Sequence, residues 1–202
     1  QVLLFSASIS NKTIKQANTI TYNPVIYELS KENKELIPKT IKHIFIISDR
    51  RERIETLRKI AKAVNSDKTM IFINTKYDLE ESLQKLQYHN YNVAALAGNI
   101  DKQSKKKAVE DFQNGRLQYL LATDVAARGL QIDHVSTVIN VNLPEEPTEY
   151  LHRAGRCGRN NEQGLCISII TENELNKIKK YQKAFNINIV QKRLYNGKIV
   201  SK

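Results

Sequence analysis

Five short apolar runs, rich in β-branched residues, recur along this sequence and are separated by longer amphipathic stretches. The runs are nearly continuous in apolar residues, which is typical of strands buried on both faces of a parallel sheet. Between them, apolar residues recur at helical spacing, as Leu79, Leu83 and Leu86 do. Strand and helix in alternation predict an α/β domain with right-handed crossovers. The runs are 69-TMIFIN-74, 92-NVAALA-97, 117-LQYLLAT-123, 136-STVINVN-142 and 165-LCISII-170.

Capping signals mark where several of these helices begin or end. Thr171 followed by Glu174 is a capping-box pattern at the start of the last helix. Asp101 is suited to cap a helix that ends near Asn114. Pro147 is suited to begin another helix, because proline is favoured at the first helical position.

The N-terminal segment has a different pattern from the rest of the chain. It contains an apolar strand pattern (2-VLLFSAS-8), a polar helical stretch and a short strand pattern near 25-VIYEL-29, and then a polar segment with Pro38 that resembles a linker. The sequence starts within a strand pattern and has no initiator methionine. We therefore expect three parts: residues 1–30 as the end of another domain, 31–38 as an interdomain linker and 39–202 as the main domain.

Charge and composition narrow the class of partner. The net charge is +11, from 32 Lys and Arg against 21 Asp and Glu, which favours a polyanion such as nucleic acid. A solvated lysine-rich surface would give the same balance. No apolar run approaches the ~18 residues of a membrane span. Cys157 and Cys166 form no metal-binding spacing, so we expect no metal site in this chain and a reducing compartment, the cytoplasm or nucleus.

Polar residues follow four of the predicted strands. In open parallel sheets, ligands bind where the strands end. Each residue by itself is explained by a turn or a helix cap, but all of them fall on one edge of the predicted sheet. That edge is therefore the predicted ligand site. The residues are Thr75 and Lys76, Gly98 and Asn99, Thr123 and Asp124, and Asn142 with Leu143 and Pro144.

The segment 122-ATDVAARGLQI-132 combines a hydroxyl, a carboxylate and an Arg-Gly pair at one strand end. Thr123 can donate a hydrogen bond to a phosphate oxygen, and Gly129 allows a ligand close to the backbone. Helix capping by Asp124 and a surface ion pair of Arg128 are the alternatives.

The segment 147-PTEYLHRAGRCGR-159 carries His152, Arg153, Arg156 and Arg159 on what we expect to be neighbouring helical turns. Arginine is the residue suited to bidentate recognition of phosphate. Gly155 and Gly158 remove side chains that would keep a large ligand away. The pattern favours arginine fingers acting on a phosphate chain, with a solvated basic helix face as the alternative.

At this point the sequence resembles DEAD-box RNA helicases. The segments "TDVAARGLQI" and "YLHRAGRCGR" resemble motifs V and VI of that family, and "MIFINTK" resembles motif IV. "LAGNIDKQSKKKAVEDFQNG" resembles the segment between motifs IV and V, and "LLFSAS" resembles motif III, which closes the first domain. The resemblance covers nearly the whole chain in the right order. It implies a RecA-like three-layer α/β sandwich with a mostly parallel sheet, preceded by the last part of a first domain.

The resemblance implies an ATP-dependent RNA helicase that binds ATP and RNA between two RecA-like domains. The resemblance implies that Arg156 and Arg159 are catalytic arginine fingers and that they bind ATP together with Gly129 and Gln131. It implies that the RNA backbone is bound by Thr75, Gly98, Lys106 and Thr123. It also implies that coupling between the domains depends on Asp124, Arg128, His152 and Arg153.

Several residues depart from the family pattern, and two of its motifs are missing. Ser8, Lys106, Asn142 and Cys157 replace commoner residues, and Gln131 replaces an aspartate that contacts the ATP ribose, so the ribose contact stays open. No G-x-x-x-x-G-K-[ST] loop and no Asp-Glu-Ala-Asp stretch occur. The first domain is expected to supply both and to hold Mg²⁺, so the fragment alone is predicted to be inactive. A DNA helicase or translocase and a non-catalytic RNA-binding module are the alternatives.

Overall fold

The computed structural model describes residues 2–5, 11–27, 37–97, 100–130, 132, 134–158 and 162–201. The chain divides into two compact units, Gln1–Lys34 and Glu35–Lys202. The expected limits of the linker stay a prediction.

The first unit contains one described helix, α1 (Asn11–Ile20). Residues 2–5 and 24–27 form no strand, so the strands expected at 2–8 and 25–29 are not found in the described parts of those ranges. An extended segment becomes a strand only when a neighbouring strand pairs with its backbone. Phe5 and Tyr27 are fully accessible to solvent, with exposed fractions of 90% and 91%. These segments are apolar in composition, but no core among the described residues of this unit covers them.

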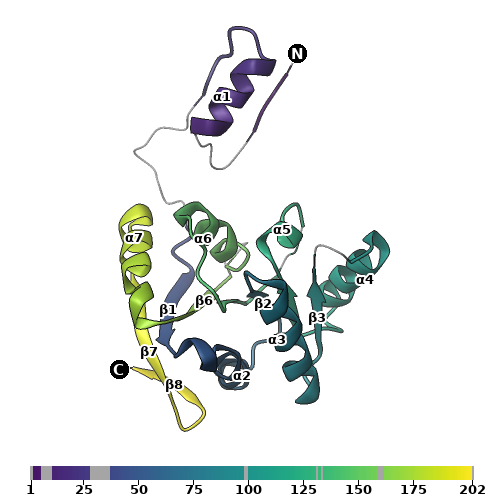
Figure 1. Ribbon diagram of the computed structural model, residues 1–202, viewed down its shortest axis with the longest axis vertical. Coiled ribbons are helices and arrows are strands. Elements are labelled where there is room, and N and C mark those ends of the chain that lie inside the picture. Colours follow the sequence, from purple (N-terminus) through teal and green to yellow (C-terminus); the bar gives the residue numbers. More distant parts are fainter. Residues whose placement is uncertain are drawn as a thin grey trace. The chain divides into compact units, whose positions relative to one another are not determined.

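The second unit is built on one sheet of eight described strands in the order β3-β4-β2-β5-β6-β1-β7-β8. Every neighbouring pair is parallel except β7 and β8. Figure 1 shows the yellow β7–β8 hairpin at one end of the sheet and β3 at the other. The strands are β1 (Ile41–Ile47), β2 (Thr69–Phe72), β3 (Val93–Leu96), β4 (Tyr119–Ala122), β5 (Thr137–Asn140), β6 (Gly164–Ile170), β7 (Ile189–Tyr195) and β8 (Lys198–Ser201).

All five runs predicted to be strands are strands, β2 to β6. Every residue of β2, β4 and β5 is buried, which is why these strands appear in the sequence as continuous apolar runs. Sequence reasoning missed β1, β7 and β8. In β7, buried or half-buried positions mix with exposed ones, so the strand lacks the continuous pattern that was sought.

Helices cover both faces of the sheet, which confirms the three-layer α/β fold (Figure 1). One face is covered by α2 and α3, through Leu57, Ile60 and Leu79 among others. The other is covered by α4 to α7, through residues such as Phe112 and Tyr150. The helices are α2 (Arg53–Val64), α3 (Lys76–Tyr88), α4 (Lys102–Gln113), α5 (Asp124–Ala127), α6 (Pro147–Ala154) and α7 (Leu175–Phe185), with short 3-10 turns at Arg50–Glu52 and Glu172–Glu174.

The predicted capping signals are confirmed. The Asp101 carboxylate accepts hydrogen bonds from the backbone N–H groups of Gln103 and Ser104 at the start of α4. The backbone N–H of Thr171 donates to Glu174 in a capping box that begins the turn before α7. Pro147 is the first residue of α6. None of the helices in the described part of the chain is both long and apolar enough to cross a membrane.

Candidate functional site

The guanidinium of Arg153 is the centre of the predicted site, at the edge where the parallel strands end. Its side chain is 1% exposed. Nε and Nη2 donate to the two carboxylate oxygens of Asp124, at 2.7 and 2.5 Å. Nη2 also donates to Asn74 Oδ1 at 2.8 Å, and Nη1 donates to the carbonyl of Asn142 at 2.7 Å and to Asn140 Oδ1 at 3.3 Å. The ends of β2, β4 and β5 are thus tied to α6 through one side chain.

This geometry decides two of the alternatives. A solvated basic face does not describe Arg153, because its charge is buried and paired with a carboxylate that is itself only 24% exposed. Asp124 is not the cap of α5, since the side chain that accepts from that helix is Thr123. A buried bidentate pair of this kind fixes the orientation of both groups. The predicted coupling residues Asp124 and Arg153 are therefore brought together.

Asn74 and Asn142 belong to this network, and sequence reasoning gave neither of them a role in it. The backbone N–H of Asn74 donates to Asn142 Oδ1 at 3.1 Å, and Asn74 Nδ2 donates to the carbonyl of Leu143 at 3.2 Å. The ring of Phe72 lies beneath the Arg153 guanidinium, with 5.1 Å between the ring centroid and Cζ. The signal available in the sequence was an amide side chain at each of two strand ends, within otherwise apolar runs.

A cavity of about 280 Å³ opens beside this network. It brings together several of the predicted residues from two motifs that are distant in sequence. Arg156 Nη1 donates to the carbonyl of Leu130 at 2.7 Å, which links the segment after α6 to the segment after α5. Arg128 forms an ion pair with Glu149 at 3.2 Å, so the surface ion pair that was the alternative for Arg128 is present, and both residues line the cavity. The lining residues are Phe72, Asp124, Ala127, Arg128, Gly129, Glu149, His152, Arg153 and Arg156.

The expected helical placement of the arginines needs a correction. Helix α6 ends at Ala154, with Gly155 as its C-cap. Of the predicted basic residues, only His152 and Arg153 lie on the helix, and Arg156 lies in the turn after it. The helix stops here because the next residue is Gly155, and glycine is a poor helix former that suits a change of chain direction.

The role expected for Gly158 also needs a correction. Gly158 has a left-handed backbone, with φ of 66°, and a Cβ atom at this position would lie 2.5 Å from a side-chain carbon of Ile41. The glycine therefore allows the chain to pack against β1, and the close approach is to protein. Gly129 differs, because it has a φ of 73° but a Cβ there would meet nothing within 4 Å. Of these two, only Gly129 has the open surroundings that were expected for a ligand.

Three of the predicted RNA-binding residues have a visible structural role. The hydroxyl oxygens of Thr75 and Thr123 accept from backbone N–H groups as the caps of α3 and α5. Lys106 lies on α4, exposed, with its Nζ 3.7 Å from a carboxylate oxygen of Glu110. A threonine hydroxyl that accepts in a cap can still donate to a phosphate oxygen. Thr75 and Thr123 follow β2 and β4, which are neighbours in the sheet.

Four other predicted site residues, Gly98, Asn99, Gln131 and Arg159, lie outside the described residues, as does Ser8. Both cysteines are buried and free. Burial raises the pKa of the Cys166 thiol to about 11 and raises that of Cys157 further above its usual value. Thiols held neutral in this way are not suited to nucleophilic chemistry. Within the described part of the chain, no group of three or more His, Cys, Asp or Glu residues is arranged to hold a metal ion.

Comparison with known proteins gives one consistent result. Residues 52–161 match the family described as the helicase conserved C-terminal domain. The DEAD-box ATP-dependent RNA helicase CshC of Bacillus cereus is 31% identical over 201 residues, which cover 99% of this chain and 50% of that protein. DEAD-box ATP-dependent RNA helicase RhpA of Helicobacter pylori is 32% identical, over 94% of this chain and 38% of that protein.

The fold is shared with solved structures of the same kind. A structure of S. cerevisiae Dbp5 bound to RNA and ADP BeF3 matches with a TM-score of 0.82 and 28% identity, over 94% of this chain and 50% of that one. A structure of the C-terminal domain of the DEAD-box protein Dbp5 matches with a TM-score of 0.72 and 29% identity, over 76% of this chain and 91% of that one. The chain spans about half the length of CshC and of another curated relative, the probable ATP-dependent RNA helicase YfmL of Bacillus subtilis.

Proposed function

Because this chain belongs to the family of DEAD-box ATP-dependent RNA helicases, as their second RecA-like domain, we propose that it acts with a first domain in hydrolysing ATP and that it couples hydrolysis to local unwinding or remodelling of RNA. The observation that carries the proposal is the cavity in which Arg156 and the open backbone at Gly129 lie beside the buried Arg153–Asp124 pair. In this arrangement the Arg156 guanidinium, which is suited to bind phosphate, lies next to a buried ion pair that is connected to the strand ends.

In the proposed site, Arg156 acts on the phosphate chain of ATP as an arginine finger, together with Arg159. A guanidinium stabilises the charge that spreads over the transferred phosphoryl group in the transition state. Gly129 and Gln131 bind the rest of the nucleotide in this proposal. The phosphate-binding loop and the carboxylates that hold Mg²⁺ come from the first domain, since the sequence of this chain contains neither motif.

RNA binds, in this proposal, along the strand ends of β2, β3 and β4. Thr75 and Thr123 donate to phosphate oxygens there, and Gly98 and Lys106 are the other RNA-binding residues of the proposal. Contacts to the backbone carry little sequence information, so binding is largely independent of base sequence. That the matched Dbp5 structure holds RNA together with ADP BeF3 supports these two ligand classes.

The proposed coupling follows because residues of the Arg153 network are direct neighbours, in the chain, of the threonines proposed to bind RNA. Asn74 precedes Thr75, and Asp124 follows Thr123, while Arg153 donates to both Asn74 and Asp124. A displacement of Arg153 would therefore change the positions of both threonines. Its position on α6, three residues before Arg156, connects it to the phosphate side of the site. Arg128 and His152, which line the same cavity, complete the interdomain surface in this proposal.

RNA-stimulated ATP hydrolysis, measured with the complete protein and with this chain alone, tests the proposal. The complete protein should hydrolyse ATP faster when single-stranded RNA is present, and this chain alone should show no turnover because it lacks the Mg²⁺ and phosphate-loop ligands. Turnover by the purified chain would contradict the division of roles between the domains. Equal stimulation by RNA and by single-stranded DNA would favour the DNA helicase or translocase alternative, and absence of hydrolysis by the complete protein would favour a non-catalytic RNA-binding module.

A further inference from the structure

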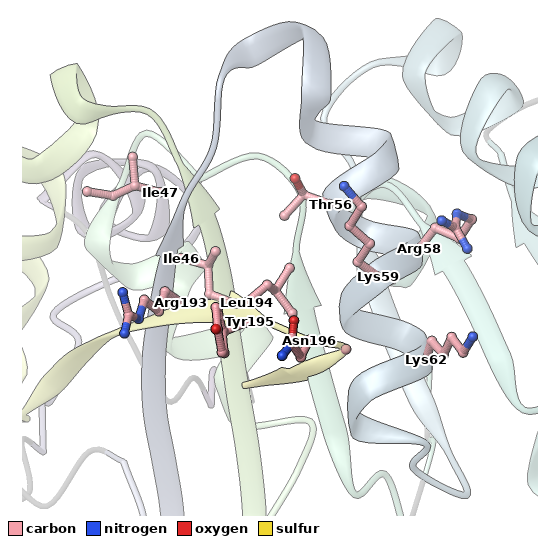
Figure 2. A pocket seen from close by; sticks show the side chains of 11 residues that line it. Ile46, Ile47, Thr56, Arg58, Lys59, Lys62, Arg193, Leu194, Tyr195 and Asn196 are labelled. Carbon is pink, nitrogen blue, oxygen red and sulfur yellow. The ribbon is translucent and has the colours of Figure 1, made fainter. Parts of the chain in front are cut away.

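The polar side chain of Asn140 is completely buried at the carboxyl end of the inner strand β5. Its register partners are Phe72 on β2 and Ser168 on β6, and Ser168 is in turn paired with Phe45 on β1. Phe45 and Phe72 belong to the core under α4 to α7, whereas Ile46, the next residue of β1, belongs to the other core and lines the hollow beside α2 (Figure 2). Because paired residues of neighbouring strands share a face of the sheet, Asn140 points into the α4–α7 core, where a polar side chain is costly unless it is hydrogen-bonded.

Asn140 supplies one of the five hydrogen-bond acceptors around the Arg153 guanidinium. An arginine side chain carries five N–H donors and no acceptor. The Asp124 carboxylate takes two of these donors, and Asn74 Oδ1 and the Asn142 carbonyl take one each. The fifth hydrogen bond runs from Nη1 to Asn140 Oδ1 at 3.3 Å. It is the longest of the five, so we expect Asn140 to fix the direction of the guanidinium more than the strength with which it is held.

The amide of Asn140 fits its surroundings in only one of its two orientations. Its Nδ2 donates to Ser168 Oγ at 3.3 Å and to Cys166 Sγ at 3.6 Å, and both of these residues are completely buried on β6. Half a turn of the amide would place Nδ2 against the Arg153 guanidinium, which has only donors to offer. Buried donors left without an acceptor are costly. The amide therefore ties the guanidinium to β6 and keeps its acceptor oxygen directed at Nη1.

The orientation of the guanidinium matters because its Nη2 joins two strand ends. Nη2 donates to both Asn74 and Asp124, which are the chain neighbours of the two threonines proposed to bind RNA. Nη1 and Nη2 belong to one planar, rigid group, so a change at Nη1 also moves Nη2. Loss of the Asn140 acceptor leaves a buried N–H of Arg153 unpaired, and the guanidinium gains a reason to turn away from the two strand ends.

We propose that Asn140 is a positioning residue, which holds the Arg153 guanidinium in the orientation that bridges Asn74 and Asp124, and that the coupling between nucleotide binding and RNA binding depends on it. The inference rests on the coupling role proposed above for Arg153. Asn140 touches neither ligand and acts only through Arg153. Its buried partners on β6 extend the proposed coupling network one strand further across the sheet.

Four variants separate positioning from simple loss of packing. Asn140→Ala removes the acceptor at Nη1. Its matched control is Val138→Ala, because Val138 is also completely buried on β5 and in the same core, so that its truncation opens a cavity without removing a hydrogen bond. Asn140→Asp keeps an acceptor oxygen for Nη1, and its second oxygen can accept from the Ser168 hydroxyl. Arg153→Lys removes the guanidinium itself. All variants are compared at a temperature at which unfolding curves show each of them folded.

Nuclear magnetic resonance of the 202-residue chain reports on the guanidinium directly. The Arg153 Nη–H signals, identified by their loss in Arg153→Lys, should exchange slowly with water in the original chain, because the group is buried and fully hydrogen-bonded. In Asn140→Ala these signals should broaden and exchange faster, whereas Val138→Ala and Asn140→Asp should keep them. Unchanged signals in Asn140→Ala would overturn the proposal.

Coupling is measured in the complete protein, as the ratio of its affinities for a non-hydrolysable ATP analogue with and without saturating single-stranded RNA. Asn140→Ala should lower this ratio by roughly 2–30-fold, Val138→Ala should keep it near the original value, and Asn140→Asp should retain most of it. Equal losses in the two alanine variants would overturn the proposal, as would a loss in Arg153→Lys with none in Asn140→Ala. If Arg153→Lys itself keeps the original ratio, the coupling role proposed above fails instead, and the Arg153 signals alone decide whether Asn140 positions that side chain.

Discussion

At the scale of single residues, Arg153 and Gly158 show how far a motif identifies chemistry. The spacing of arginines every third residue by itself suggested one common role, the family resemblance assigned Arg153 a different role from Arg156, and the structure gives the two side chains different surroundings. Arg153 is buried in a hydrogen-bond network, and Arg156 lines a cavity. Likewise Gly158 serves packing, while Gly129 is open. The sequence pattern alone identified these residue types, but it could not predict which of them are buried, because burial depends on contacts with β1, β2 and β5.

Replacement of Arg153 by alanine is expected to destabilise the domain by about 3–5 kcal/mol, because it leaves the Asp124 carboxylate without its partner in a mostly buried position. Arg116→Ala is the control, since Arg116 pairs with Asp111 at 2.8 Å but is 70% exposed, and it should cost less than about 1 kcal/mol. Chemical denaturation of the 202-residue chain measures both. Equal losses would mean that Arg153 is not a structural centre.

Gly158→Ala should destabilise more than Gly129→Ala. Both positions have a left-handed backbone, so each substitution carries a strain of roughly 1 kcal/mol. Only at Gly158 does the added Cβ lie 2.5 Å from Ile41, which adds an overpacking cost of about 1–3 kcal/mol. Thermal unfolding of the two variants provides the comparison. If the two alanine variants unfold at the same temperature, the contact with Ile41 does not govern the choice of glycine.

At the scale of elements, the sequence was most informative where the local signal was strong. The cap at Asp101, the capping box at Thr171 and the start of α6 at Pro147 depend on neighbouring residues and were found as expected. Strand β7 was missed because its position at the outer part of the sheet leaves it half-exposed. Strand β1 was missed although it occupies an inner position between β6 and β7; Lys42 and His43 interrupt its apolar pattern.

His43 makes β1 a source of pH-dependent stability. Burial lowers its pKa from 6.5 to about 4, and the ring lies within the core with Nδ1 2.8 Å from Tyr150 Oη. Because the folded pKa is below the unfolded one, the unfolded state binds the proton first. This contribution to the free energy of unfolding is complete above pH 6.5 and is lost as the pH falls toward 4, by at most about 1.4 kcal/mol per pH unit.

The measurement is the free energy of unfolding of the original chain and of His43→Asn, from urea titrations across that pH range. Between pH 6.5 and 4 the original chain should lose more stability than the variant, which has no group at this position that titrates there. Parallel losses in the two proteins would show that other groups dominate acid unfolding.

At the scale of the whole molecule, the net charge of +11 and the proposed contacts to phosphate predict weak RNA binding by this chain alone. Affinity for single-stranded RNA should fall on the order of tenfold between 50 and 200 mM salt, with little preference for base sequence. Titration of several unrelated strands at two salt concentrations measures both properties. Strong discrimination among strands would indicate readout of base edges and would contradict the proposed backbone contacts.

The proposed role of Arg156 is tested most directly by single-turnover ATP hydrolysis in the complete protein with saturating RNA. Arg156→Ala should reduce the rate by about 10³–10⁵-fold, and Arg156→Lys nearly as much, because a point charge does not reproduce the planar fork. Arg116→Ala, an exposed arginine outside the cavity, should keep the original rate. A near-original rate for Arg156→Ala would contradict the arginine-finger role and leave this residue a structural or RNA-binding function.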